Sequence, residues 1–218
     1  ARPTTANLIE KEKAMKESIR HFIVISGAYW LCQPQQGSHY IAQQLKESFP
    51  EVLERALTYT TRPARKNEVH GVHHYFISNE EFSLWESNMD ALHNEFEFRY
   101  GLATADVENA WKQNMIAFSF VNGRGALSLQ ENFTTKGSKC FIIYVKPPSD
   151  AEAFLKSIHE RNIFSLDQVQ QVAEHYHNDE DIVPEFDAII DFDELQDCDA
   201  VFNKLMQVVK EYIDAVIR

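Results

Sequence analysis

Residues 56–78, "ALTYTTRPARKNEVHGVHHYFIS", differ in pattern from the chain on either side of them. Threonine, tyrosine and valine alternate with other residues, and this alternation favours short strands. Pro63 closes one strand and Gly71 stands at a turn. The stretch therefore predicts a small antiparallel unit inserted into the remainder of the chain.

Outside this stretch, short apolar segments alternate with helical patterns. Segments such as "FIVIS" and "FIIYV" are β-branched and apolar throughout, as strands buried on both faces are. Strands alternating with helices predict a mostly parallel sheet with helices on both faces, which is the α/β class. The expected strands are 22–26, 96–102, 115–121, 139–145 and 186–191, and the expected helices are 41–49, 79–85, 104–113, 123–133, 150–160, 166–178 and 197–217.

Composition limits the classes of partner. The chain has 218 residues and a net charge of −12, which argues against nucleic acid or an anionic membrane surface as the main partner. Three cysteines stand far apart without a CxxC pair, so neither a disulfide framework nor a zinc site is indicated. No signal peptide and no apolar run long enough for direct membrane insertion is present, so we expect a cytoplasmic protein.

The order of these segments resembles the guanylate kinase family over residues 21–215. The most specific piece is "TTRPxRxxEVxGVxxxF", which is similar to the family's "TTRxPRxGEVxGxxYxF". The resemblance implies a P-loop nucleoside monophosphate kinase-like fold: a mostly parallel sheet flanked by helices, with an inserted mixed β subdomain that binds GMP. It implies a kinase-like domain at 21–218, with the inserted subdomain at 57–100 and a lid-like region at 156–183. The charged, helix-prone residues before it predict a helical lead-in or linker at 1–20.

The family transfers a phosphoryl group from ATP to GMP, and its P-loop carries the signature GxxxxGK[ST]. Here Gly27 and Gly37 are separated by nine residues instead of four. By resemblance, Ser38 takes the position of the lysine, and His39 takes that of the hydroxyl residue that holds Mg²⁺. Loss of such a cation removes about 3–5 kcal/mol of transition-state stabilisation, so the sequence predicts a degenerate P-loop.

The GMP-binding part is preserved unevenly. Arg62, Arg65 and Tyr100 match the family's phosphate-binding residues, while Thr58 replaces a serine and His74 replaces a tyrosine. The side that reads guanine is changed, because the family's polar residues align with apolar or different ones, which predicts weak guanine specificity. Those positions hold Ala91, Leu102, Phe120 and Asn122. Of three lid arginines only Arg161 remains, since Ser157 and Val172 occupy the other positions.

These replacements lead to the expectation of a catalytically inactive domain, a pseudo-guanylate kinase. It would serve as a protein–protein interaction or structural module with a residual phosphate-binding site, bind nucleotide weakly or not at all, and need no cofactor or metal. The pattern is similar to guanylate kinase-like domains of scaffold proteins, and of a leucine-rich-repeat protein of sperm and cilia, which implies a cytoskeletal or axonemal location. Two alternatives stay open: a scaffold domain that binds a phosphorylated protein partner, and an active nucleoside monophosphate kinase.

Overall fold

The computed structural model describes residues 20–29, 37–150, 170–171, 174, 176, 179–195 and 197–217. The predicted lead-in at 1–20, apart from residue 20, lies outside these ranges. Most of the lid-like region, including Arg161 and Val172, lies outside them as well. The helices expected at 150–160 and 166–178 and the role of Arg161 therefore stay predictions.

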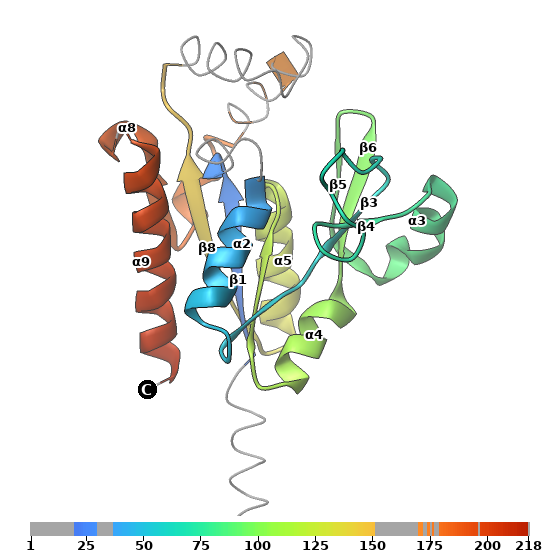
Figure 1. Cartoon of the computed structure of the whole chain (residues 1–218), viewed down its shortest axis with the longest axis horizontal. Coiled ribbons are helices and arrows are strands. Elements are labelled where there is room, and N and C mark those ends of the chain that lie inside the picture. Colours follow the sequence, from blue (N-terminus) through green and yellow to red (C-terminus); the bar gives the residue numbers. More distant parts are fainter. Residues whose placement is uncertain are drawn as a thin grey trace, which may run out of the picture.

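A parallel sheet forms the centre of the molecule (Figure 1). Its order is β2-β7-β1-β8-β9, and every neighbouring pair is parallel. Its strands are β1 (His21–Gly27), β2 (Leu53–Arg55), β7 (Ile116–Phe120), β8 (Lys139–Lys146) and β9 (Ala188–Asp191). This confirms the predicted α/β class with a mostly parallel sheet.

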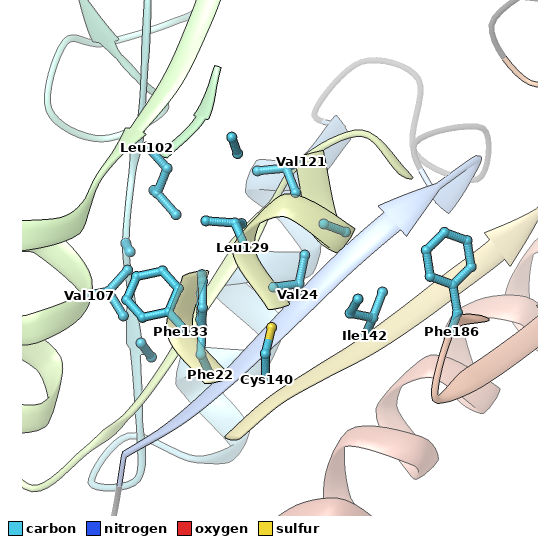
Figure 2. Close-up of a cluster of buried hydrophobic side chains, with 14 of the residues drawn as sticks. Phe22, Val24, Leu102, Val107, Val121, Leu129, Phe133, Cys140, Ile142 and Phe186 are labelled. Atoms are coloured by element: carbon cyan, nitrogen blue, oxygen red, sulfur yellow. The ribbon is translucent and has the colours of Figure 1, made fainter. Parts of the chain in front are cut away.

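Helices cover both faces of this sheet, because successive residues of the central strand point to opposite sides. On one face, Phe22 and Val24 of β1 pack with α4 (Thr104–Lys112) and α5 (Gly123–Thr135), as Figure 2 shows in part. On the other face, alternate β1 residues pack against α2 (Gly37–Ser48) and α9 (Cys198–Ile217). The short helices η3 (Val183–Glu185) and α8 (Phe192–Leu195) flank β9.

A second, smaller sheet stands beside the first and has the order β4-β3-β6-β5 (Figure 1). Its elements are β3 (Thr58–Thr60), β4 (Tyr75–Phe76), α3 (Asn79–Trp85), η2 (Glu86–Asn88), β5 (Met89–Glu95) and β6 (Phe98–Ala103). β3 pairs in parallel with β4, while β6 is antiparallel to both β3 and β5. The antiparallel unit predicted from the residue pattern is therefore wrong for the β3–β4 pair, which is parallel, and the mixed β subdomain implied by the resemblance is confirmed.

Ser78 begins α3 with a capping box, in which its hydroxyl accepts from Glu81 N and the Glu81 carboxylate accepts from Ser78 N. This confirms the short helix predicted at 79–85. Within the described ranges, no helix has both the length and the apolar character that crossing a bilayer requires.

Candidate functional site

Four of the predicted phosphate-binding residues lie together at the second sheet, in β3, in β6 and in the loop between β3 and β4. We call them the cradle: Thr58, Arg62, His74 and Tyr100. The antiparallel pairing of β3 with β6 sets Thr58 opposite Leu102 and Thr60 opposite Tyr100. The Thr58 hydroxyl and His74 Nδ1 share a hydrogen bond of 2.7 Å, and the rings of His74 and Tyr100 meet edge to face. Burial raises the pKa of Tyr100, while Arg62 lies close enough for its positive charge to act on the phenol in the direction that lowers this pKa, and Arg62 completes the group.

Glu68 holds the guanidinium of Arg62 in a fixed orientation. Arg62 donates from Nη1 and Nη2 to the two carboxylate oxygens at 2.8 and 2.9 Å, a bidentate pair. The side chains are only 10% and 15% exposed, and Arg65 N adds a third hydrogen bond to Glu68 at 2.7 Å. Burial acts to raise the pKa of Glu68, but the hydrogen bonds from Arg62 and Arg65 outweigh it and lower the pKa to about 2. Arg62 is thus positioned before any ligand arrives.

His74 is neutral at physiological pH. Burial is the largest cause, and the positive charges of Arg55 and Arg62 add to it, so that the pKa of His74 falls to about 3. A neutral imidazole keeps one N–H to donate and adds no charge to the cradle. The cradle therefore offers one fixed guanidinium, a phenol, a hydroxyl and an imidazole to a phosphate.

Other predicted residues stand apart from this group. The side chain of Arg65 is exposed, and among the described contacts only its backbone N–H reaches toward the cradle, through Glu68. Ala91 and Leu102, which take positions where the family reads guanine, are buried apolar residues at 3% and 0% exposure. Ala91 has a positive φ of 51° and lies in a register shift of β5, so the backbone here is also irregular.

The second part of the site lies at the carboxyl end of the parallel strands, where β1 ends at Gly27 and α2 begins at Gly37. Gly27 has φ +83°, and a Cβ there would lie 2.2 Å from the Val145 carbonyl oxygen, so the position requires glycine. Ser38 and His39 fall in the first turn of α2. Tyr29, at the start of the loop, packs against Phe120 with a ring centroid distance of 5.0 Å; residues 30–36 lie outside the described ranges.

Arg55, at the end of β2, is a residue that the sequence reasoning missed. Its Nη2 lies 3.4 Å from Ser38 Oγ and 3.3 Å from the His73 carbonyl oxygen. Its guanidinium carbon lies 5.4 Å from the centroid of the Phe120 ring. Burial lowers the pKa of Arg55 to about 10, which leaves it charged at neutral pH. A cation therefore stands beside the position from which the P-loop lysine is missing.

The site offers no built metal centre among the described residues, since no three of their His, Cys, Asp or Glu side chains are placed to hold an ion. His39 stacks on His73 with a centroid distance of 4.1 Å. Mg²⁺ prefers oxygen ligands, and an imidazole offers only nitrogen. His39 therefore does not replace the hydroxyl residue that binds Mg²⁺ in the motif.

The fold is that of the P-loop nucleoside monophosphate kinases. The chain superposes on the crystal structure of guanylate kinase from Anaplasma phagocytophilum with a TM-score of 0.63, at 19% identity, covering 91% of this chain and 88% of that one. The guanylate kinase family model matches residues 20–212, and the chain belongs to that family.

Curated relatives match at 26–28% identity and over most of their length. The guanylate kinase of Chlamydia abortus is 26% identical over 196 residues, covering 84% of this chain and 91% of the relative. That of Chlamydia felis is 28% identical over 165 residues, covering 73% and 76%. That of Mesomycoplasma hyopneumoniae is 26% identical over 196 residues, covering 88% and 96%.

These relatives contradict the expectation of an inactive pseudo-guanylate kinase that acts as an interaction, structural or scaffold module, because each carries the name of the enzyme. That prediction is corrected. It rested on the combined replacement of the P-loop lysine and hydroxyl residue, the guanine-reading residues and two lid arginines, and it took the loss of those residue types at their motif positions as the loss of catalysis. The geometry shows that a cation can reach the same place from a different strand, as Arg55 does beside Ser38.

Proposed function

We propose that the chain is a guanylate kinase, which transfers the terminal phosphoryl group of ATP to GMP and releases ADP and GDP. The observation that carries the proposal is the cradle, in which Glu68 orients Arg62 through a bidentate pair beside Thr58, His74 and Tyr100. The names of the curated relatives support the same reaction. ATP enters as its Mg²⁺ complex, so the ion belongs to the substrate.

In this reaction an oxygen of the GMP phosphate attacks the γ-phosphorus of ATP. A new P–O bond forms as the bond between the γ-phosphorus and the β-bridging oxygen breaks, and ADP leaves with that electron pair. The second pKa of a phosphate monoester is about 6, so the attacking oxygen is already ionised and no proton has to be removed. The protein therefore acts by positioning and by charge stabilisation.

The cradle supplies the positioning. The outer face of the Arg62 guanidinium and the Tyr100 hydroxyl would hold the GMP phosphate, and the Thr58–His74 hydrogen bond fixes the imidazole beside them. Charge-assisted bonds from a guanidinium to a phosphate are short and directional, so they fix the angle of attack as well as adding affinity. A cradle that is already oriented loses less entropy when the ligand binds.

The test is a coupled assay of ADP formation with ATP, Mg²⁺ and GMP, comparing the wild type with Arg62→Gln. We expect GMP-dependent turnover in the wild type and a rise of about 100-fold in the KM for GMP in the variant, because one charged phosphate contact is lost. Arg20→Gln is the matched control: Arg20 is exposed and immediately precedes β1, at the end of that strand opposite Gly27. A wild type that forms no ADP in response to GMP overturns the proposal.

The same assay with AMP, CMP and UMP measures base preference. Because Ala91 and Leu102 present no polar groups to a base, we expect GMP to be favoured less than in a site that reads guanine by hydrogen bonds. We propose the cytoplasm as the place of action. A cytoskeletal or axonemal location, and a protein partner with or without a phosphate, stay predictions from the sequence, to be tested by imaging and by pull-down from native tissue.

A further inference from the structure

Arg55 lies where the two parts of the site meet. Its Nη2 contacts Ser38 Oγ in the first turn of α2 at 3.4 Å, and its Nη1 contacts the Val72 carbonyl oxygen at the same distance. Nη2 also contacts the carbonyl oxygen of His73, which directly precedes His74 of the cradle. The stacked rings of His39 and His73 join the same two segments. One guanidinium therefore spans the gap between the start of α2 and the cradle.

The hydrogen bonding of this guanidinium is poor. All three contacts are 3.3–3.4 Å long and go to neutral oxygens, whereas a guanidinium bonds a carboxylate or phosphate at about 2.7–2.9 Å. Its Nε is buried and has no acceptor among the described residues, and His39 Nδ1 nearby is also buried without a partner there. Arg55 is a charged group that has lost part of its hydration and has gained no full replacement.

The neighbouring carboxylates are bound to other cations. Glu54 precedes Arg55 in β2 but accepts from Lys46 Nζ at 2.6 Å. Glu68 accepts both guanidinium bonds of Arg62. Among the described residues no carboxylate forms an ion pair with Arg55, so its charge is left for a ligand. Arg55 is half-buried, and the contact of its Nη1 with the Val72 carbonyl oxygen lies at the surface, so an anion can reach the guanidinium from that side.

We propose that Arg55 binds the terminal phosphates of the donor nucleotide and supplies the cation that Ser38 does not. This inference rests on the proposed function, in which donor and acceptor phosphates meet between α2 and the cradle. Among the described residues, Arg55 is a cation that lies near both groups of phosphates. It reaches Ser38, where the P-loop motif has lysine, and lies beside His74, where the acceptor would be held.

The chemistry suits the transfer. A γ-phosphate that moves toward the acceptor spreads negative charge over its oxygens, and a guanidinium fork can bond two of them at once. Arg55 also stands over the Phe120 ring, which keeps water from one side of the charge. It is therefore expected to stabilise the transferring group and to reduce the repulsion between two anionic substrates.

The test combines binding with turnover, and it uses Arg55→Gln, Ser38→Lys and the double variant. Inorganic tripolyphosphate titrated by calorimetry reports the donor site without any catalysis, and GMP reports the acceptor site. We expect Arg55→Gln to weaken tripolyphosphate binding at least tenfold and leave GMP binding within twofold, with kcat falling about 100-fold. The double variant, Arg55→Gln with Ser38→Lys, should recover at least a tenth of the wild-type kcat, because Ser38→Lys returns a cation to the position at which the P-loop motif has lysine.

The melting temperature serves as the control for correct folding of the variants. Because Arg55 has no ion-pair partner among the described residues, Arg55→Gln should melt at or above the wild-type temperature, whereas a structural arginine would lower it. The inference is overturned if the wild type does not bind tripolyphosphate at millimolar concentration, or if Arg55→Gln binds it as tightly as the wild type. Binding that depends on Arg55 without any GMP-dependent turnover supports the inference and overturns the proposed function instead, so the two failures are distinct.

Discussion

The two halves of the site differ in whether their arginine is paired with a carboxylate among the described residues. In the cradle, Arg62 is held by both oxygens of Glu68 and is only 10% exposed. At the start of α2, Arg55 has three long contacts to neutral oxygens and an Nε without an acceptor among the described residues. The acceptor end is thus complete without a ligand, and the donor end is not.

This difference sets what each half does when a ligand arrives. A phosphate in the cradle shares Arg62 with Glu68, so it meets a guanidinium that is already oriented and adds a charge-assisted bond to an existing ion pair. A phosphate beside Arg55 meets a guanidinium that has no ion-pair partner among the described residues. Folding has already removed part of the water around this guanidinium, so ligand binding has less of it to remove. The first arrangement contributes to stability and the second reserves its charge for binding.

The backbone shows the same contrast, and it gives the largest expected effect. Gly27 at the donor end and Gly71 in the loop of the cradle both have positive φ, +83° and +77°. A Cβ at Gly27 would lie 2.2 Å from the Val145 carbonyl oxygen, whereas at Gly71 the nearest atom is 3.9 Å away. Gly27→Ala should therefore lose about 4 kcal/mol of unfolding free energy and Gly71→Ala about 1 kcal/mol, measured by urea unfolding.

Gly137 provides the control for this pair, because its φ is +76° and a methyl group there would have no atom of the described residues within 4 Å. Gly137→Ala measures backbone strain alone. If Gly27→Ala costs no more than Gly137→Ala, then the end of β1 moves away from β8 and the donor end is not rigid.

The central strands and the helices that pack on them could be predicted from the sequence, because apolar and amphipathic segments are buried in the core whatever their surroundings in the chain. The strand at 22–26 and the helix at 123–133 were both expected, and β1 and α5 form there. β2 and β5 were not expected. β2 has only three residues, and its two polar side chains, Glu54 and Arg55, look like surface residues when read along the chain.

The site was predictable only on the side that carries a motif. The motif around Arg62 contains two of the four cradle residues, Arg62 and His74, and the resemblance predicts the other two, Thr58 and Tyr100. Arg55 had no such signal, because its meaning comes from Ser38, 17 positions earlier, and from His73, 18 positions later. A sequence motif specifies a residue type at a fixed position, so it does not detect a cation that is supplied by a residue on a different strand.

His74 gives the next effect, on the dependence of stability on pH. Its pKa is about 3 in the folded chain because of burial and of the charges of Arg55 and Arg62, against 6.5 for an ordinary histidine, while Glu68 acts in the opposite direction and His73 adds to the lowering. The unfolded chain therefore binds the extra proton first, so stability is full above pH 6.5 and falls as the pH drops toward 3. We expect about 2 kcal/mol to be lost between pH 6.5 and 5, at close to 1.4 kcal/mol per pH unit.

His74→Tyr removes this titration, so its unfolding free energy should fall less steeply than that of the wild type over the same range in urea experiments at stepped pH. The remaining slope comes from groups such as His21 and His39, whose pKa values are also lowered by burial. His70, exposed in the same loop, is the matched control, and His70→Gln should keep the wild-type slope. Equal slopes for the wild type and His74→Tyr would mean that the imidazole is charged in the folded cradle.

The smallest effect tests whether the cradle is held by charge. Glu68→Gln keeps the shape but loses the charged pair with Arg62, and should cost about 1.5 kcal/mol at pH 7. Because the pKa of Glu68 is lowered to about 2 from 4.5, the carboxylate stabilises the fold fully above pH 4.5, and this contribution is lost as the pH falls toward 2. The difference between the variant and the wild type should therefore close over that range. A constant difference from pH 7 to pH 2 would show that Glu68 acts through packing, and that Arg62 carries an unneutralised charge like that of Arg55.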